Sequence, residues 1–177
     1  MDAVGNVLGR WNVGEGPAVM SGSHLDTVPR GGRFDGLLGA AAALEAIEAI
    51  KEAGIVPKRP LVVVATAEEE GRFGGMLGSD ALSGGVDAAW YLQAADEAGT
   101  SLQDALRQAG LDPSLDAIRS AALDPKDVAA FLELHVEQVG AEALGACEGR
   151  RSSAAGSARV STCVLGCRRA PCWRRRT

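Results

Sequence analysis

Short apolar runs alternate with helical patterns over the first 138 residues of the chain. The segments Val4–Trp11 and Ala18–Ser21 predict strands, and the continuous β-branched run Leu61–Thr66 predicts a central strand that is buried on both faces. Phe131–Val136 alternates apolar and polar residues, which is typical of a further strand. Because helical segments separate these strands, the pattern predicts a layered α/β domain.

The clearest helical pattern covers Gly36–Ala53, where apolar residues recur every three or four positions and a glycine follows the last turn. A shorter helix is predicted around Met76–Leu82. A third is predicted over Leu102–Gln108, because Ser101 and Asp104 resemble a capping box at its start. These helices lie between the predicted strands, as a layered α/β domain requires.

Residues 139–177 differ in composition from the rest of the chain. Periodicity stops there, and Ala, Gly, Ser, Cys and Arg predominate. Residues 1–138 hold 10 basic and 21 acidic residues, a net charge of −11, whereas residues 139–177 hold 8 basic and 2 acidic residues, a net charge of +6. We expect an unstructured tail whose cysteines are reduced, because little core surrounds them. These are Cys147, Cys163, Cys167 and Cys172.

The overall composition limits the class of protein. A chain of 177 residues with 46% hydrophobic residues and a net charge of −5 has the length of one domain and is neither generally disordered nor a dedicated nucleic-acid binder. No apolar stretch approaches the roughly 18 to 20 residues of a membrane-spanning helix. The first residues also lack the basic and apolar regions of a signal peptide. We therefore expect a cytoplasmic protein that does not associate with membranes.

A first cluster of ligand-type side chains follows the strand predicted at Ala18–Ser21. It contains His24, Asp26 and Asp35, the last directly before the long helix. An imidazole that binds a metal needs an acceptor for its other ring nitrogen, and Asp26 is close enough along the chain to provide one. Simpler interpretations exist for two of them: His24 as a surface loop histidine, and Asp35 as the N-cap of the helix.

Two further clusters also follow or lie on predicted strands. Glu68, Glu69 and Glu70 come directly after Leu61–Thr66, and three adjacent carboxylates repel one another unless a cation neutralises them. One can bind a metal while its neighbour acts as a general base, although a solvated acidic turn is the simpler interpretation. The third cluster is centred on His135, which taken alone is a half-buried strand histidine.

The combination of the three clusters points to a metal site. Both histidines of the chain and the acidic groups lie at predicted strand ends, where an open α/β sheet assembles its functional site. Imidazole and carboxylate ligands without cysteine suit a catalytic zinc or manganese ion better than a structural zinc site.

The segments GSHLDTVPRGGRFDGLLG, AEEEGRFGGMLGS and LELHVEQ resemble the signatures of a known family. This family comprises the dinuclear-metal amidohydrolases that include N-carbamoyl-L-amino-acid hydrolase, allantoate amidohydrolase and β-ureidopropionase. The opening DAVGN is similar to the family's D-x-x-G-N segment, and the similarity extends over residues 1–138. It implies that these residues form part of a three-layer α/β/α, metallopeptidase-like catalytic domain with a mixed sheet.

The resemblance also implies roles for individual residues. His24 would bind the first of two divalent ions, zinc or manganese, and Asp26 would orient that histidine. Asp35 would bridge both ions, and His135 would complete the ligands of the first ion.

The carboxylate triplet leaves two alignments open. Aligned without a gap, Glu68 corresponds to the family's general base and Glu69 to the ligand of the second ion. A register shifted by one residue assigns these roles to Glu69 and Glu70 instead.

The activity implied by the resemblance is hydrolysis of a carbon–nitrogen bond in a linear amide. The expected substrate is a small molecule, most simply an N-carbamoyl-L-amino acid or allantoate. Aminoacylase or dipeptidase action on the same scaffold is the alternative chemistry.

The resemblance ends at Val139, where the family reads Gly-Pro and continues into a second domain. That domain forms the family's homodimer interface, and a further metal-binding histidine follows it. We therefore expect a chain shorter than the proteins of this family, without their dimerisation domain. The resemblance does not establish that this shorter chain is itself active. We also expect residues 139–177 to be translated out of frame. Coding DNA in which no other frame continues with Gly-Pro would contradict this.

A non-enzymatic alternative concerns the tail itself. Its charge of +6 would suit binding to nucleic acid or an acidic membrane through Arg168, Arg169 and Arg174–Arg176. The cysteine spacing does not match a zinc ribbon, so no metal-stabilised fold is predicted there.

Overall fold

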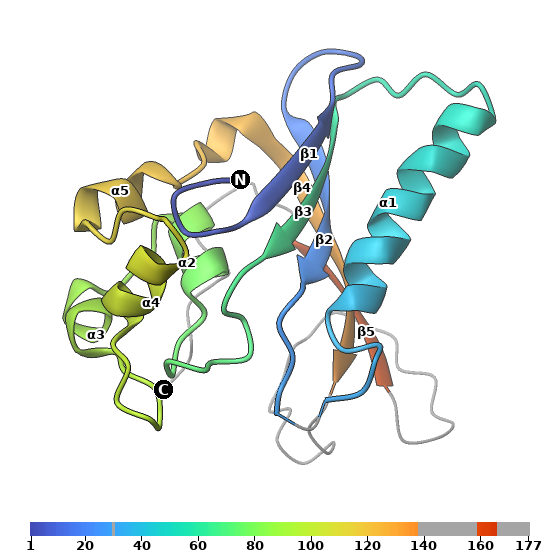
Figure 1. The fold of residues 1–177 in the computed structure, drawn as a ribbon. Helices are drawn as coiled ribbons and strands as arrows, with labels where there is room; N and C mark the ends of the chain where they lie inside the picture. Colours follow the sequence, from blue (N-terminus) through green and yellow to red (C-terminus); the bar gives the residue numbers. More distant parts are fainter. Residues whose placement is uncertain (30, 138–158, 166–177) are drawn as a thin grey trace.

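The computed structural model describes residues 1–29, 31–137 and 159–165, and its centre is a mixed β-sheet (Figure 1). Within these residues the sheet has five strands in the order β1-β3-β2-β4-β5. β2 pairs in parallel with both β3 and β4, whereas β1 and β5 are antiparallel strands at the two edges. The strands are β1 (Val7–Trp11), β2 (Ala18–His24), β3 (Leu61–Thr66), β4 (Val128–Glu137) and β5 (Arg159–Leu165).

Helices cover both faces of this sheet. The long helix α1 packs on one face, against β2, β3 and β4, and the short helices lie on the other side (Figure 1). The three-layer α/β/α arrangement with a mixed sheet is thereby confirmed. None of the helices in the described part of the chain is long and apolar enough to cross a bilayer. The helices are α1 (Leu37–Glu52), α2 (Leu77–Ser83), α3 (Ala88–Gln93), α4 (Leu102–Gln108), α5 (Leu115–Ser120) and the 3₁₀ turn η1 (Pro125–Asp127).

Two apolar clusters hold these layers together. The first lies on the sheet, where Met20 and Val64 are buried and Leu82 of α2 packs against them. The second joins the short helices around Tyr91, which is 1% exposed and whose hydroxyl donates a hydrogen bond of 2.6 Å to the carbonyl of Pro113. The short helices therefore form a layer with its own core.

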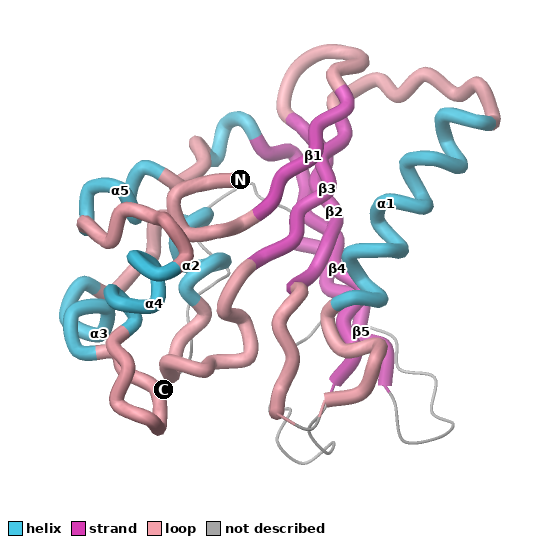
Figure 2. Tube along the Cα trace, viewed as in Figure 1, coloured by secondary structure: helices cyan, strands magenta, loops and turns pink. Residues whose placement is uncertain are grey.

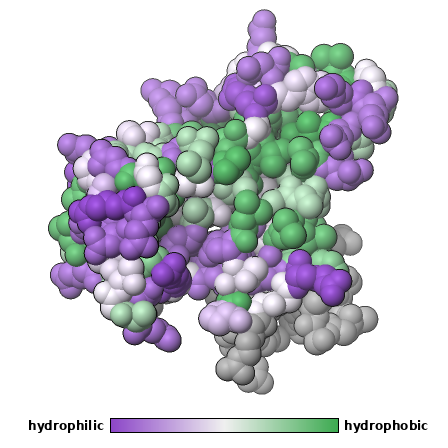
Figure 3. Space-filling view, in the orientation of Figure 1, coloured by the Kyte–Doolittle hydropathy of each residue, from purple (hydrophilic) through white to green (hydrophobic). Residues whose placement is uncertain are grey.

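The α1 face of the sheet is covered less completely. Apolar side chains gather on the surface over α1 and the neighbouring strands (Figure 3). Leu37 and Leu44 of α1 are 52% and 54% exposed, and Val56, just after the helix, is 76% exposed. One helix is too narrow to cover the whole sheet, so apolar surface remains open on this side.

The elements predicted from periodicity are present, with small shifts at their ends. Leu102–Gln108 is helical as predicted, and the hydroxyl of Ser101 accepts a hydrogen bond from the amide of Asp104. The helices α3 and α5 were not predicted, although Asp87 and Ser114 cap their first turns. Each has only six residues, too few for apolar periodicity to emerge.

The strand β5 lies in the segment for which an unstructured tail was expected. It pairs with β4 from Phe131 opposite Leu165 to Glu137 opposite Arg159, so the expectation is wrong for these residues. The strand contains three β-branched residues, and β4 offers an otherwise unpaired edge, which together favour strand pairing. Residues 138–158 and 166–177, and the predictions made for them, lie outside the described part.

The close approach of β2 and β3 leads to a stability prediction. A Cβ atom on Gly22 would overlap the carbonyl of Val64 on β3, whereas a Cβ on Gly9 in β1 would meet no atom within 4 Å. We expect Gly22→Ala to lower the free energy of unfolding by about 1–3 kcal/mol because the strands must move apart. Urea unfolding measures this, with Gly9→Ala as the matched control. Equal stability of the two variants would contradict the prediction.

Candidate active site

The three sequence clusters meet at one edge of the sheet. β3, β2 and β4 run in parallel, so their carboxyl ends share an edge, and the loops that leave β2 and β3 emerge there together (Figure 2). His24 is the last residue of β2 and pairs with Thr66, the last residue of β3. His135 lies near the end of β4, and Glu68 follows β3 by two residues. The topology thus assembles the residues predicted from separate segments.

The side chain of His24 is fully buried among carboxylates. Its Nδ1 lies 2.7 Å from the carbonyl oxygen of Asp26, which can only accept, so Nδ1 carries the proton and donates it. Nε2 then faces Asp35 Oδ1 at 3.8 Å, Glu69 Oε2 at 3.5 Å and Glu70 Oε1 at 3.8 Å. With 0% of its side chain exposed, His24 is not the surface loop histidine of the simpler interpretation.

These atoms are spaced as ligands of a metal ion would be. His24 Nε2 and Asp35 Oδ1 are buried without a hydrogen-bond partner among the described residues. Two ligand atoms bound about 2.1 Å from a tetrahedral ion lie about 3.4 Å apart, close to the observed 3.5–3.8 Å. One possible ligand group is His24, Asp35 and Glu70, and a second is His24, Glu69 and His135, each with its atoms within 4.8 Å of one another. The residues therefore fit divalent ions.

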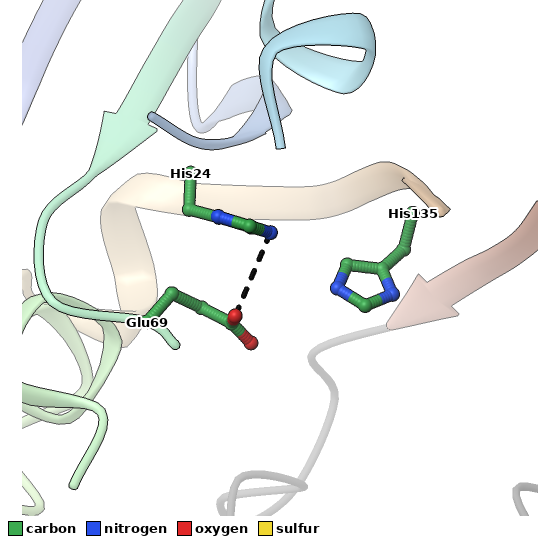
Figure 4. Close-up of side chains that lie close together, drawn as sticks. All are labelled: His24, Glu69 and His135. Carbon is green, nitrogen blue, oxygen red and sulfur yellow. Dashed lines mark ion pairs between the residues drawn. The ribbon is translucent and has the colours of Figure 1, made fainter. Parts of the chain in front are cut away.

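His135 reaches the same space from the neighbouring strand. Its ring lies 5.6 Å from the ring of His24, centroid to centroid, with an angle of 46° between the planes. Figure 4 shows the carboxylate of Glu69 directed at His24, with His135 beside them. The two histidines that are far apart in the sequence therefore lie on one site.

Asp35 does not cap α1. The N-cap is Gly36, no side chain caps the helix, and the carboxylate of Asp35 is fully buried beside His24. Its Oδ2 accepts a hydrogen bond of 3.2 Å from the amide of Val28. Gly36 has a φ of 61°, and a Cβ atom there would overlap His24, so only glycine lets the chain turn into α1 this close to the imidazole.

Asp26 connects the histidine to the carboxylate loop. Its backbone carbonyl accepts from His24, whereas its carboxylate Oδ1 lies 3.8 Å from the same ring nitrogen. The other oxygen, Oδ2, accepts hydrogen bonds from the amides of Glu69 at 2.9 Å and Glu70 at 2.8 Å. Asp26 therefore orients His24 through its main chain and positions the two glutamates through its side chain.

Glu68 lies outside both ligand groups. Its carboxylate accepts a hydrogen bond of 2.7 Å from the amide of Phe73, farther along the same loop. Its φ of 55° is the one positive value among the non-glycine residues of the described part. Because of this left-handed backbone conformation, the side chain of Glu68 points in a different direction from the side chains of the two glutamates that follow.

The crowding of carboxylates alters their ionisation. Burial raises the pKa of Glu70 to about 7, and the charges of Glu69 and Asp35 add to the effect. Burial also raises the pKa of Glu69, with His24 and His135 acting in the opposite direction. The site therefore favours a cation, or protons in its place.

One neighbour of the site was not identified from the sequence. Glu133 accepts a hydrogen bond of 2.8 Å from the hydroxyl of Ser23, and its charge contributes to the raised pKa of Glu69. Its spacing of two residues from His135 places both on one face of β4, which is the signal that would have found it.

Comparisons with known proteins show the family of the chain. The model of peptidase family M20/M25/M40 matches residues 20–155, so the chain belongs to this family. Over 143 residues it is 46% identical to the N-carbamoyl-L-amino acid amidohydrolase of Geobacillus stearothermophilus, covering 77% of this chain and 34% of that protein. It is 42% identical over 142 residues to the ureidoglycolate hydrolase of Oryza sativa subsp. japonica, covering 77% and 29%.

A solved structure shows the same fold. The amidase of the hydantoinase/carbamoylase family from Burkholderia phymatum superposes with a TM-score of 0.68 at 39% identity, covering 79% of this chain and 33% of that one. The chain thus spans about one third of the length of the relatives it matches. The resemblance to the amidohydrolases of this family is confirmed for the catalytic fold.

The raised pKa of Glu70 leads to a prediction for the metal-free chain. Its ordinary pKa is 4.5 and its value in the fold is about 7, so between these pH values the folded state binds more protons than the unfolded state. The free energy of unfolding should therefore fall as the pH rises from about 4.5 through about 7. Urea unfolding in EDTA measures the free energy of unfolding at pH 5 and pH 8. Between these two pH values it should fall less for Glu70→Gln than for the unmodified chain. Glu45→Gln, an exposed change on α1, should behave like the unmodified chain.

Proposed function

We propose that this chain carries part of the active site of a metal-dependent hydrolase that cleaves a carbon–nitrogen bond in a linear amide. The observation that carries the proposal is the buried imidazole of His24, whose unprotonated nitrogen faces three carboxylates at 3.5–3.8 Å. The names of the relatives favour a ureido-type substrate, an N-carbamoyl-L-amino acid or a compound such as allantoate or ureidoglycolate. The chain spans about a third of the length of those proteins.

The geometry favours the second alignment of the carboxylate triplet. Glu70 groups with His24 and Asp35, while Glu69 groups with the two histidines, and Glu68 belongs to neither group. We therefore assign Glu70 and Asp35 as the residues that would hold the second ion. His24, Asp35 and His135 would hold the first ion.

Glu69 is then the general base. Its carboxylate is partly exposed, 18% by surface, and burial raises its pKa, which suits a group that accepts and returns a proton. In the proposed reaction Glu69 takes a proton from water, the water oxygen bonds to the amide carbon, and the carbon–nitrogen bond breaks. Glu69 returns the proton to the leaving nitrogen. Bound divalent ions, zinc or manganese, would lower the pKa of the attacking water and polarise the carbonyl.

The assignment predicts different effects for three neighbouring isosteric changes. Glu70→Gln removes a ligand charge and should weaken zinc binding about tenfold or more, and His24→Ala should do the same. Glu69→Gln should retain zinc but lose hydrolysis. Glu68→Gln should retain zinc affinity within about twofold, because its hydrogen-bond acceptor remains. Calorimetric titration of zinc into each variant makes the comparison.

The same series contains its controls. Loss of zinc affinity in Glu69→Gln, with Glu70→Gln unaffected, would restore the first alignment, in which Glu69 is the ligand and Glu68 the base. Unchanged zinc binding in His24→Ala would contradict a metal site of any composition. Thermal unfolding of each metal-free variant shows whether a change in affinity reflects lost structure.

Substrate class is tested by comparing three amides in the presence of zinc or manganese. We expect hydrolysis of an N-carbamoyl-L-amino acid or of allantoate, and none of an N-acetyl amino acid, because the relatives named above act on ureido compounds. Preference for the N-acetyl compound would favour the aminoacylase alternative. Zinc binding without hydrolysis of any of the three would identify the chain as a metal-binding remnant. A cytoplasmic location stays a prediction.

A further inference from the structure

A buried asparagine lies just before β1 with all its polar atoms engaged. Asn6 is 0% exposed. Its Nδ2 donates hydrogen bonds to Asp2 Oδ2 at 2.7 Å and to the carbonyl of Gly78 at 3.0 Å. Its Oδ1 accepts one of 2.9 Å from the amide of Ala67. A side chain with both a donor and an acceptor is therefore required at this position.

The partners of Asn6 are the two ends of the carboxylate loop. Ala67 is the residue before Glu68, Gly78 lies in the first turn of α2, and the amide of Gly78 donates to the carbonyl of Ala67 at 2.9 Å. A Cβ atom on Gly78 would overlap both Asn6 and Ala67, so these contacts leave no space for a larger residue. Asn6 thus lies across the base of the loop 67–78.

The N-terminal turn holds the asparagine in turn. Asp2 Oδ1 accepts hydrogen bonds from the amides of Val4 at 3.0 Å and Asn6 at 2.8 Å. Its other oxygen fixes the orientation of the Asn6 amide. The first six residues therefore form a rigid support for a loop that lies more than sixty residues away in the sequence.

We propose that Asn6 is a positioning residue, which sets the direction in which the loop 67–78 leaves β3 and so places Glu69 and Glu70 at the metal site. The inference rests on the proposed function for the roles of these glutamates. Asp26 fixes the middle of the loop through the amides of Glu69 and Glu70, and Asn6 fixes its base. Both anchors are needed because the two carboxylates repel each other and the loop would otherwise relax apart.

The test compares Asn6→Asp with Asn12→Asp in the full chain. The first keeps the size of the side chain but places an oxygen against the carbonyl of Gly78 and the carboxylate of Asp2. The second makes the same charge change at an exposed asparagine after β1. In metal-free protein we expect hydrogen exchange in residues 67–78 to rise about tenfold or more for Asn6→Asp and to stay unchanged for Asn12→Asp. Zinc affinity should fall about tenfold only in Asn6→Asp.

Three outcomes would overturn the proposal. These are unchanged exchange in residues 67–78, a rise of equal size throughout the protein, and unchanged zinc affinity despite a locally raised exchange. If Asn6→Asp does not fold, hydrogen exchange in Asp2→Ala tests the proposal instead. This change removes one hydrogen-bond partner of the Asn6 amide at a half-buried site. A rise about threefold and confined to the same loop supports the proposal, and a uniform rise or none overturns it. If the unmodified chain binds no zinc, the proposed function fails, while the exchange comparison still decides whether Asn6 holds the loop.

Discussion

The burial of His24 among like-charged carboxylates is the constraint on which the rest of the site depends. Three carboxylate oxygens lie within 3.8 Å of one imidazole nitrogen, and none of that ring is exposed. Burial raises the pKa of Glu70, and the negative charges of Glu69 and Asp35 raise it further. The fold must therefore hold these side chains close together in spite of their repulsion when no cation is bound. A rigid sheet edge can hold them in this way.

Main-chain groups provide much of that rigidity. The carbonyl of Asp26 fixes the proton of His24, and the amides of Glu69 and Glu70 bind the carboxylate of the same aspartate. Asn6 closes the loop at its base through the backbone of Ala67. One short loop is thus held at several points by groups from the segment after β2 and from the N-terminal turn, which leaves the glutamate side chains available for the site.

Much of this could be predicted from the sequence, and the failures have physical causes. Leu61–Thr66 is a strand, as its unambiguous β-branched run predicts. The short helix α3 was not predicted because tertiary packing around Tyr91 stabilises it, and its short sequence carries no periodic apolar pattern. The strand β5 was missed because pairing with the edge of β4 decides it. Asp35 had two interpretations, as a cap or as a ligand, and only its burial beside His24 separates them.

The sequence by itself determined the class of fold and the family and predicted the candidate ligand residues, because strand patterns and ligand-type side chains are local properties. It could not decide which two of three consecutive glutamates face the site, since adjacent positions differ only in the direction of their side chains. The tertiary structure decided that question. A left-handed φ at Glu68 and the bond from its carboxylate to Phe73 turn this residue away, while Asp26 holds the next two amides toward His24. These contacts join residues distant in the chain, so no local pattern encodes them.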